Sequence, residues 1–192
     1  MSQDPRSVEV PTGSAWSCIS TIVPKLMDEL VCGSPDPAGE TFMLNRGDIG
    51  LVASLDKLSA EEASSTHAGG ATIAAHVDHL RYGLSLLNQW ATGAPAPWAT
   101  ADWTASWKRG VVSESEWRAL RKDLAREARA WTSALRTPRE VDEFQASWMI
   151  GNVAHLAYHL GAIRQIDRGA RGPTAEDETR AKAARTSDSQ SH

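Results

Sequence analysis

Two histidines in the C-terminal half of the chain have the clearest capacity for chemistry. His155 and His159 lie four positions apart in a segment of strong helical periodicity, so their imidazoles stack one turn apart on one face. The rest of that face is mostly apolar and includes Phe144, Trp148 and Ile163. Two imidazoles spaced in this way can bind one metal ion from a single helix.

A second helical segment carries histidines on or near its apolar stripe. His76 shares a face with Ile73 and Leu80, whereas His79 lies about 60° round the helix from it and Asp78 is predicted to face away. A buried imidazole costs stability unless it is paired, and the cores of helical bundles are known locations of metal sites. The residues alone therefore leave two interpretations open, a metal site or a cluster of neutral histidines joined by hydrogen bonds.

The elements that must position these histidines are helices. Apolar periodicity predicts helical segments over residues 14–31, 48–58, 72–91, 113–135 and 137–168. Pro24 should kink or split the first of these. Capping-box patterns at Ser113–Glu116 and Thr137–Glu140 predict where the last two begin. No strand-like alternation competes, so the sequence predicts an all-α protein.

Length and composition limit the class of protein further. The chain has 192 residues, of which 41% are hydrophobic and 23% charged, with a formal net charge of -4. These values suit one globular domain, expected over 14–169 between a flexible N-terminus (1–13) and a disordered tail (170–192). The charge balance gives no indication of a nucleic-acid partner. No stretch approaches the roughly 18 apolar residues that cross a membrane. With two cysteines and no secretory signal, we expect a cytoplasmic protein.

Tryptophan is unusually frequent, with eight residues against two each of phenylalanine and tyrosine. Trp98, Trp103 and Trp107 fall in the long connection over 92–112, and Trp148 lies on the histidine face. Long connections often form lids or rims of binding sites, so these four are candidates for lining a pocket. Tryptophans that fill the core or anchor a loop explain the pattern equally well.

The segments around the histidines resemble the DinB/YfiT superfamily. AAHVDHL, Ala74–Leu80, and NVAHLAYHLGAI, Asn152–Ile163, are similar to its histidine early in the second helix and its His-x-x-x-His near the end of the last. The resemblance covers residues 48–166 and implies an up-down-down-up four-helix bundle, often a homodimer. By position, it implies that His76, His155 and His159 bind a divalent ion, zinc or nickel above all. The Pro/Gly break in the first helical region departs from the family pattern.

Members of that family with assigned activities are largely metal-dependent transferases that use low-molecular-weight thiols such as bacillithiol or mycothiol. The resemblance therefore implies a thiol transferase acting on a small-molecule substrate. His79, Asn152 and Tyr158 are then candidates for hydrogen bonding near the metal, although helix packing also accounts for the last two. Two alternatives stay open. The first is a metal-dependent hydrolase, which needs a general base, yet neither predicted inward face carries an acidic residue. The second is a non-catalytic, metal-stabilised binding module, which needs no general base.

Overall fold

A computed structural model describes residues 12–34, 39–137, 139, 141–174, 176–177 and 179–180, with side chains described from residue 19 onward. These residues form helices and no strand, which confirms the all-α prediction. Residues 1–11 of the predicted flexible N-terminus and most of the predicted tail beyond Thr174 lie outside the described residues.

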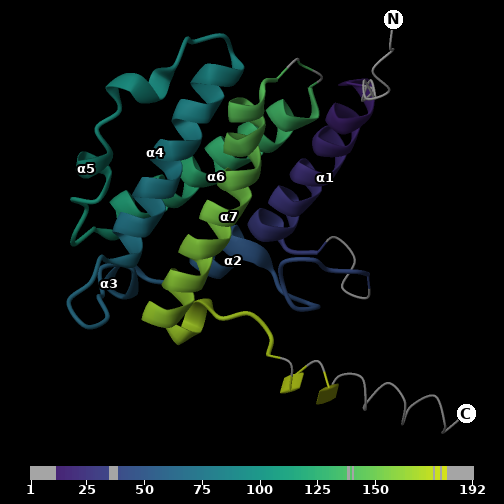
Figure 1. Cartoon of the computed structure of the whole chain (residues 1–192). Helices are drawn as coiled ribbons and strands as arrows, with labels where there is room; N and C mark the ends of the chain where they lie inside the picture. Colours follow the sequence, from purple (N-terminus) through teal and green to yellow (C-terminus); the bar gives the residue numbers. More distant parts are fainter. Residues whose placement is uncertain are drawn as a thin grey trace, which may run out of the picture.

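Four long helices form the frame of the described structure: α1 (Thr12–Cys32), α4 (Ile73–Ala91), α6 (Glu114–Arg136) and α7 (Glu143–Ile166). Shorter elements connect them: α2 (Gly50–Asp56), α3 (Ala60–Ala63), η1 (Pro97–Thr100), α5 (Trp103–Ser106) and η2 (Arg168–Ala170). Both α1 and α4 pack against α6 and α7. In Figure 1, α1 and α7 run downward while α4 and α6 run upward, so the connection between α4 and α6 returns along the length of the molecule.

Side-chain caps explain where several of these helices begin. Ser113 and Glu116 form the predicted capping box of α6. α7 begins later than predicted, because Asp142 and Gln145 form its capping box while Thr137 closes α6. Pro138 and Glu140, which belong to the predicted start, lie outside the described residues.

Two helical features bear on the sequence prediction. α1 continues through Pro24 as one helix, so of the two predicted effects, a kink or a split, the split does not occur. Proline removes one backbone hydrogen bond, but Val23 and Met27 are buried on either side of it and hold α1 against the core. The second feature is α3, which lies in a stretch predicted to be a loop and is capped reciprocally by Ser59 and Glu62.

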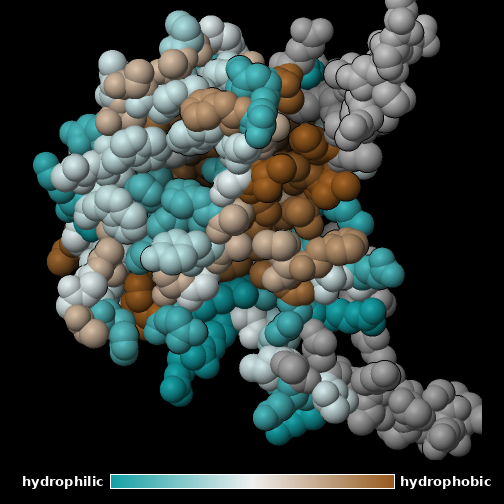
Figure 2. Space-filling view, in the orientation of Figure 1, coloured by the Kyte–Doolittle hydropathy of each residue, from teal (hydrophilic) through white to brown (hydrophobic). Residues whose placement is uncertain are grey.

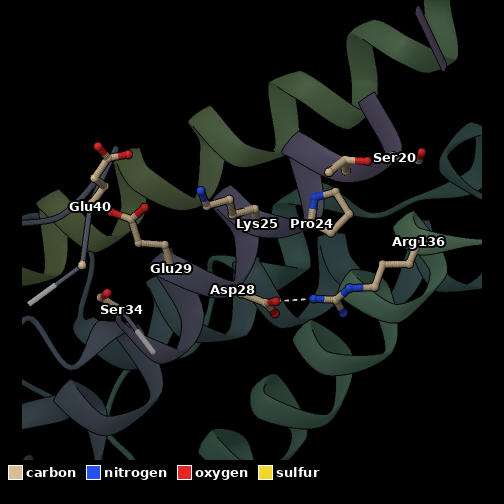
Figure 3. Close-up of a pocket in the computed structure, with 10 residues that line it drawn as sticks. Ser20, Pro24, Lys25, Asp28, Glu29, Ser34, Glu40 and Arg136 are labelled. Carbon is tan, nitrogen blue, oxygen red and sulfur yellow. Dashed lines mark hydrogen bonds and ion pairs between the residues drawn. The ribbon is translucent and has the colours of Figure 1, made fainter. Parts of the chain in front are cut away.

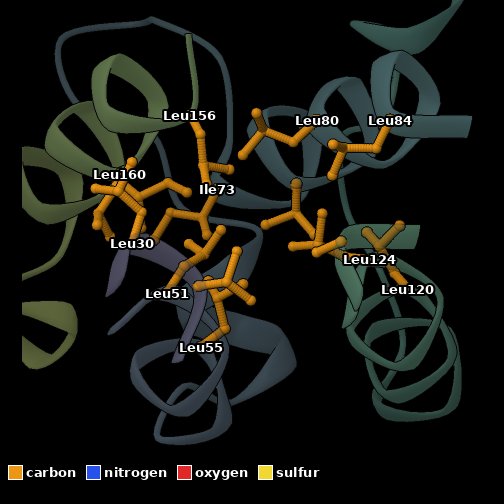
Figure 4. Packing of buried hydrophobic residues seen from close by; sticks show 14 of the residues in the cluster. Leu30, Leu51, Leu55, Ile73, Leu80, Leu84, Leu120, Leu124, Leu156 and Leu160 are labelled. Atoms are coloured by element: carbon orange, nitrogen blue, oxygen red, sulfur yellow. The ribbon is translucent and has the colours of Figure 1, made fainter. Parts of the chain in front are cut away.

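Apolar residues from five of the helices meet in one core (Figure 4). The labelled side chains are Leu30 of α1, Leu51 and Leu55 of α2, Ile73, Leu80 and Leu84 of α4, Leu120 and Leu124 of α6, and Leu156 and Leu160 of α7. Trp117 is fully buried among them, and its indole N–H donates to the carbonyl of Leu58 at 2.8 Å. This bond connects α6 to the segment that leads into α3. The indole therefore contributes apolar area without leaving its polar N–H unpaired.

The end of α1 and the start of α2 come into close contact at two glycines. Gly33 and Gly50 both have positive φ, at 80° and 74°. A Cβ atom at Gly33 would lie 2.2 Å from the carbonyl oxygen of Asp48, so only glycine fits there. The buried Asp48 carboxylate also binds Arg164 of α7 at 2.8 Å. Ala170 is fully buried, so the packed domain extends slightly beyond the predicted boundary at Gly169.

Part of the surface is apolar. On the face shown in Figure 2, apolar side chains gather where α1 and α7 lie next to each other. Ile22 of α1 and Ile150 of α7 are 52% and 55% exposed. Phe144, which the periodicity placed inward, is 59% exposed. Across the described ranges, no helix is both long enough and apolar enough to pass through a membrane.

Candidate metal centre

Four of the six histidines of the chain meet between α4 and α7. Nδ1 of His76 lies 2.8 Å from Nδ1 of His159. Nε2 of His155 lies 3.0 Å from Nε2 of His159 and 3.2 Å from Nε2 of His79. The side chains of His76, His79 and His159 are buried, and that of His155 is half-buried. The structure thus brings together the three predicted ligands and the fourth histidine, which the periodicity had placed beside the stripe.

Helix geometry accounts for this convergence. His155 and His159 are one turn apart on α7, as predicted. His76 and His79 are three residues apart in the first half of α4 and have equal exposure, 8% each. Residues three apart are neighbours on a helix surface, so both side chains reach the histidines of α7.

The tautomer of His79 follows from its neighbour Ser106. The Ser106 hydroxyl donates its hydrogen to the carbonyl of Trp103 at 2.7 Å. Its oxygen can therefore only accept at the 2.9 Å contact with Nδ1 of His79. The Nδ1–H of His79 is used in this bond, and the neutral ring has its lone pair on Nε2, which faces His155. Ser106 thus orients His79 in the way that a ligand's outer partner does at metal sites.

Burial keeps the cluster neutral. It lowers the pKa of His79 to about 4, with further contributions from the nearby His155 and His76. Burial likewise lowers the pKa of His159 to about 3, with smaller contributions from His155, His76 and His79. The pKa values of His76 and His155 are also lowered by burial. Neutral imidazole is the form that binds metal ions.

Hydrogen bonds alone do not satisfy the three Nε2 atoms. With a lone pair on Nε2 of His79, the contact with His155 requires the hydrogen of His155 to lie on Nε2. With a hydrogen on it, Nε2 of His155 has no lone pair and cannot accept from His159. The contact with Nε2 of His159 must therefore use the same His155 hydrogen as donor. One hydrogen therefore serves two short contacts. A cation at the centre would be bound by all three lone pairs.

The spacing of these nitrogens also suits a metal ion. Zinc–nitrogen bonds of about 2.0–2.1 Å at tetrahedral angles place neighbouring ligand nitrogens about 3.3 Å apart. The two contacts between Nε2 atoms, 3.0 and 3.2 Å, are close to this value. The residues present therefore fit a divalent ion bound through Nε2 of His79, His155 and His159.

His76 has a different relation to the centre. When Nε2 of His159 carries a lone pair, the hydrogen of that neutral ring lies on Nδ1 and is donated to Nδ1 of His76 at 2.8 Å. In this arrangement His76 orients His159, as Ser106 orients His79. The sequence prediction assigned His76 as a ligand and His79 to an outer position, and that assignment stays a prediction alongside the geometric one.

The tryptophan-rich connection covers the cluster. Trp107 stacks on His79 with ring centroids 4.3 Å apart and an interplanar angle of 25°, and it meets His76 edge-on at 5.3 Å. Trp103 lies 5.8 Å from His79. Arg109, at the end of the connection, binds Asp78 of α4 at 2.7 Å. Trp103 and Trp107, two of the predicted pocket candidates, therefore lie against the histidine cluster.

Asp78 corrects the sequence analysis. The periodicity predicted that it faces away from the core, but its side chain is buried between Arg81 and Arg109. The carboxylate pairs with both guanidinium groups, and this ion-pair network anchors the connection to α4. Sequence periodicity describes one helix at a time and contains no signal for a partner in a distant loop.

A cavity of about 510 Å³ opens next to the histidines, between α4 and α7. Its lining consists of His79, Gly83, Leu87, Trp103, Phe144, Ser147, Trp148, Gly151, Asn152 and His155. Of the predicted pocket candidates, Trp103 and Trp148 line this cavity and Trp107 does not. Asn152, predicted to hydrogen-bond near the metal, also lines it. Trp98 lies outside this lining and stacks on Trp148 with centroids 5.3 Å apart. Tyr158 is also outside it: its side chain is 69% exposed, although its ring touches His159 at 5.1 Å.

A second cavity, of about 660 Å³, lies beside α1 and has a different character (Figure 3). Charged side chains from α1 and its surroundings line it, including Lys25, Glu29 and Glu40. An ion pair between Asp28 and Arg136 closes one side. The Glu29 carboxylate accepts hydrogen bonds from the backbone of Phe42, Met43 and Leu44. Glu29 therefore fixes the neighbouring segment.

Comparison of the chain with protein-family models, curated proteins and solved structures found no match. Within the part of the chain that the structure describes, one group of three side chains is arranged to hold a metal ion. Ring nitrogens of its members, His79, His155 and His159, lie within 4.8 Å of one another. What the protein binds is therefore inferred from this cluster and from the cavity beside it.

Proposed function

We propose that the protein binds a divalent metal ion, zinc or nickel, through His79, His155 and His159, and that it is a transferase that activates a low-molecular-weight thiol. The observation that carries the metal site is the convergence of three Nε2 atoms while Ser106 and His76 engage the opposite nitrogens of two rings. Three protein ligands leave a coordination position open, as in catalytic zinc sites.

The residues around the centre support use of that open position by a small molecule. His79 and His155 both line the 510 Å³ cavity, so the cluster is accessible from it. Trp103 and Trp107 cover His79 and limit the access of water. An ion bound at the histidines would lower the pKa of a coordinated thiol and so make its thiolate available at neutral pH.

Thiol transfer is favoured over hydrolysis by the composition of the cavity. Hydrolysis requires a general base near the metal, and none of the described residues that line this cavity is a carboxylate. Transfer from a coordinated thiolate needs only an electrophile placed beside it. The resemblance of the histidine segments to the DinB/YfiT superfamily, together with four long helices in the order described, supports a bundle of that type.

Elemental analysis of untagged protein tests the metal site directly. The wild type should contain about one equivalent of zinc or nickel, and a His155→Ala/His159→Ala double variant should contain almost none, because two of three ligands are removed. Wild-type protein that takes up neither ion after incubation would refute the proposal, and the histidines would then be a neutral hydrogen-bonded cluster.

Turnover separates the transferase from a binding module. Metal-loaded protein is incubated with bacillithiol, mycothiol or cysteine and with 1-chloro-2,4-dinitrobenzene as an electrophile. We expect product formation that stops when the metal is chelated and returns on reloading. Full metal occupancy without turnover for any of these thiols would favour the non-catalytic module.

A further inference from the structure

The walls of the 510 Å³ cavity are aromatic and uncharged. Trp103, Phe144 and Trp148 supply three rings, and no Lys, Arg, Asp or Glu occurs in the described lining. Trp148 presents a flat surface that is backed by Trp98 at an interplanar angle of 17°. Phe144 is 59% exposed at the same cavity, so a large apolar group there has no protein cover in the described structure. Exposed apolar surface at a concave site is typical of ligand binding.

Two glycines line this space. Gly83 and Gly151 lie on the facing helices α4 and α7, and both line the cavity. A Cβ atom at Gly83 would meet the Trp103 ring at 3.7 Å, so the indole packs directly over bare backbone. A Cβ atom at Gly151 would meet nothing within 4 Å. The result is a space between helix backbone and aromatic rings, suited to a flat molecule.

The polar groups of the lining have specific positions. The Ser147 hydroxyl already donates to the carbonyl of Glu143 at 2.8 Å. Asn152 is only 9% exposed, and its carbonyl oxygen has no hydrogen-bond partner in the described structure. A buried amide without a partner is unfavourable, and it is a standard group for fixing the orientation of a ligand. His79 and His155 form another polar region of the same lining.

We propose that this cavity binds an uncharged, flat aromatic molecule, whose ring lies between Trp103 and Trp148 and whose polar end points to His79 and His155. The Asn152 amide, one helical turn from His155, hydrogen-bonds to the same molecule. The orientation of the polar end rests on the proposed function, because it is set by the ion at the histidines. Under that function, the molecule is an aromatic electrophile: one of its ring carbons forms the bond to the thiolate sulfur, and a leaving group such as chloride departs from that carbon with the bonding electrons. A cavity of about 510 Å³ is within the usual range for small-molecule sites and suits a bicyclic ring.

Three probes separate ring binding from metal binding. 2-Naphthohydroxamic acid has an aromatic ring system and a metal-binding group, acetohydroxamic acid has the metal-binding group alone, and 2-naphthamide has the ring system alone. On zinc-loaded wild type, we expect 2-naphthohydroxamic acid to bind at least about tenfold more tightly than acetohydroxamic acid, because the added apolar area leaves water. On metal-free protein, 2-naphthamide should still bind and alter tryptophan fluorescence.

A matched pair of glycine variants locates the binding. Gly151→Leu places a side chain at the cavity, whereas Gly161→Leu places one on the same helix, also in open space but outside the lining. Leucine favours a helix more than glycine does, so both variants should fold. We expect Gly151→Leu to weaken 2-naphthamide binding at least about tenfold and Gly161→Leu to leave it unchanged. Zinc content should stay the same in both.

The outcomes are distinguishable from those of the metal proposal. Equal affinity for the two hydroxamic acids on zinc-loaded protein would overturn the aromatic site while leaving the metal site intact. Failure of the wild type to take up zinc would refute the proposed function, and 2-naphthamide would still test the cavity. Binding of 2-naphthamide that is unaffected by Gly151→Leu would place the ring elsewhere and also overturn the proposal.

Discussion

Replacing His76 and His79 separately by alanine should distinguish a residue that binds the metal from one that orients a ligand. Under the proposed function, His79→Ala removes one of the three nitrogen ligands. Zinc binding in structural sites releases about 10–16 kcal/mol, which corresponds to about 2.5–4 kcal/mol for each of four ligands. We therefore expect the zinc affinity of His79→Ala to fall about 100- to 1,000-fold.

The effect of His76→Ala should be smaller. This variant removes the acceptor that lies 2.8 Å from Nδ1 of His159 but leaves the three ligands in place. Loss of such an outer partner typically lowers metal affinity about 10- to 100-fold, or about 1.4–2.7 kcal/mol. The visible absorption spectrum of the cobalt-loaded protein should be kept in His76→Ala and altered in His79→Ala, because only the second changes the ligand set.

Competition with a fluorescent zinc chelator at fixed pH gives the affinities. His67→Ala serves as the control, since His67 is exposed in a loop and should not contribute. If His76→Ala lost more affinity than His79→Ala and also changed the cobalt spectrum, His76 would be the ligand and the tautomer argument from Ser106 would be refuted.

Three further predictions test the hydrogen bond of Ser106, the burial of two histidine rings and the hydrogen bond of Trp117. Ser106→Ala removes the acceptor of the His79 Nδ1–H, so zinc affinity should fall about 10- to 100-fold at unchanged stoichiometry; an affinity equal to wild type by chelator competition would contradict this role. In metal-free protein, His79 and His159 have pKa values lowered to about 4 and about 3 from 6.5, so the unfolded state binds more protons. Stability should be complete above about pH 6.5 and fall below it by about 2.7 kcal/mol per pH unit for the pair, measured by urea denaturation, until the pH approaches these folded values. A flat profile between pH 6 and 5 would contradict burial of the two rings. Trp117→Phe leaves the Leu58 carbonyl without its buried donor and should lower the free energy of unfolding by about 1–3 kcal/mol, whereas a midpoint unchanged from wild type would show that water replaces the indole.

The contrast between His76 and His79 shows what helical periodicity can predict. It correctly identified α4 and α7 as the helices that carry the site and placed His155 and His159 together. It placed His76 on the stripe and His79 beside it, because it treats α4 as an isolated cylinder. In the folded chain α7 contacts both histidines. Which of the two is the better candidate ligand therefore depends on the contact between the helices, which periodicity does not describe.

Features fixed by a distant partner were not predictable in the same way. Asp78 is buried because Arg109 reaches it from the connection, and Ser106 matters because its own hydrogen is used by Trp103. Neither residue type is unusual in its local segment. The α3 turn is the opposite case: the Ser59–Glu62 capping-box pattern is present in the sequence, and the prediction of a loop there was wrong because it did not use this pattern.

The topology explains why the connection contacts the histidine cluster. α4 has 19 residues and is therefore about 28 Å long. Because α6 runs parallel to it in Figure 1, the chain must return that distance before α6 begins. The return path passes over the part of α4 that carries His76 and His79, and it places Trp107 on the ring of His79 and Ser106 at its Nδ1. The parallel arrangement thus provides both the aromatic cover of His79 and the hydrogen bond that fixes its tautomer.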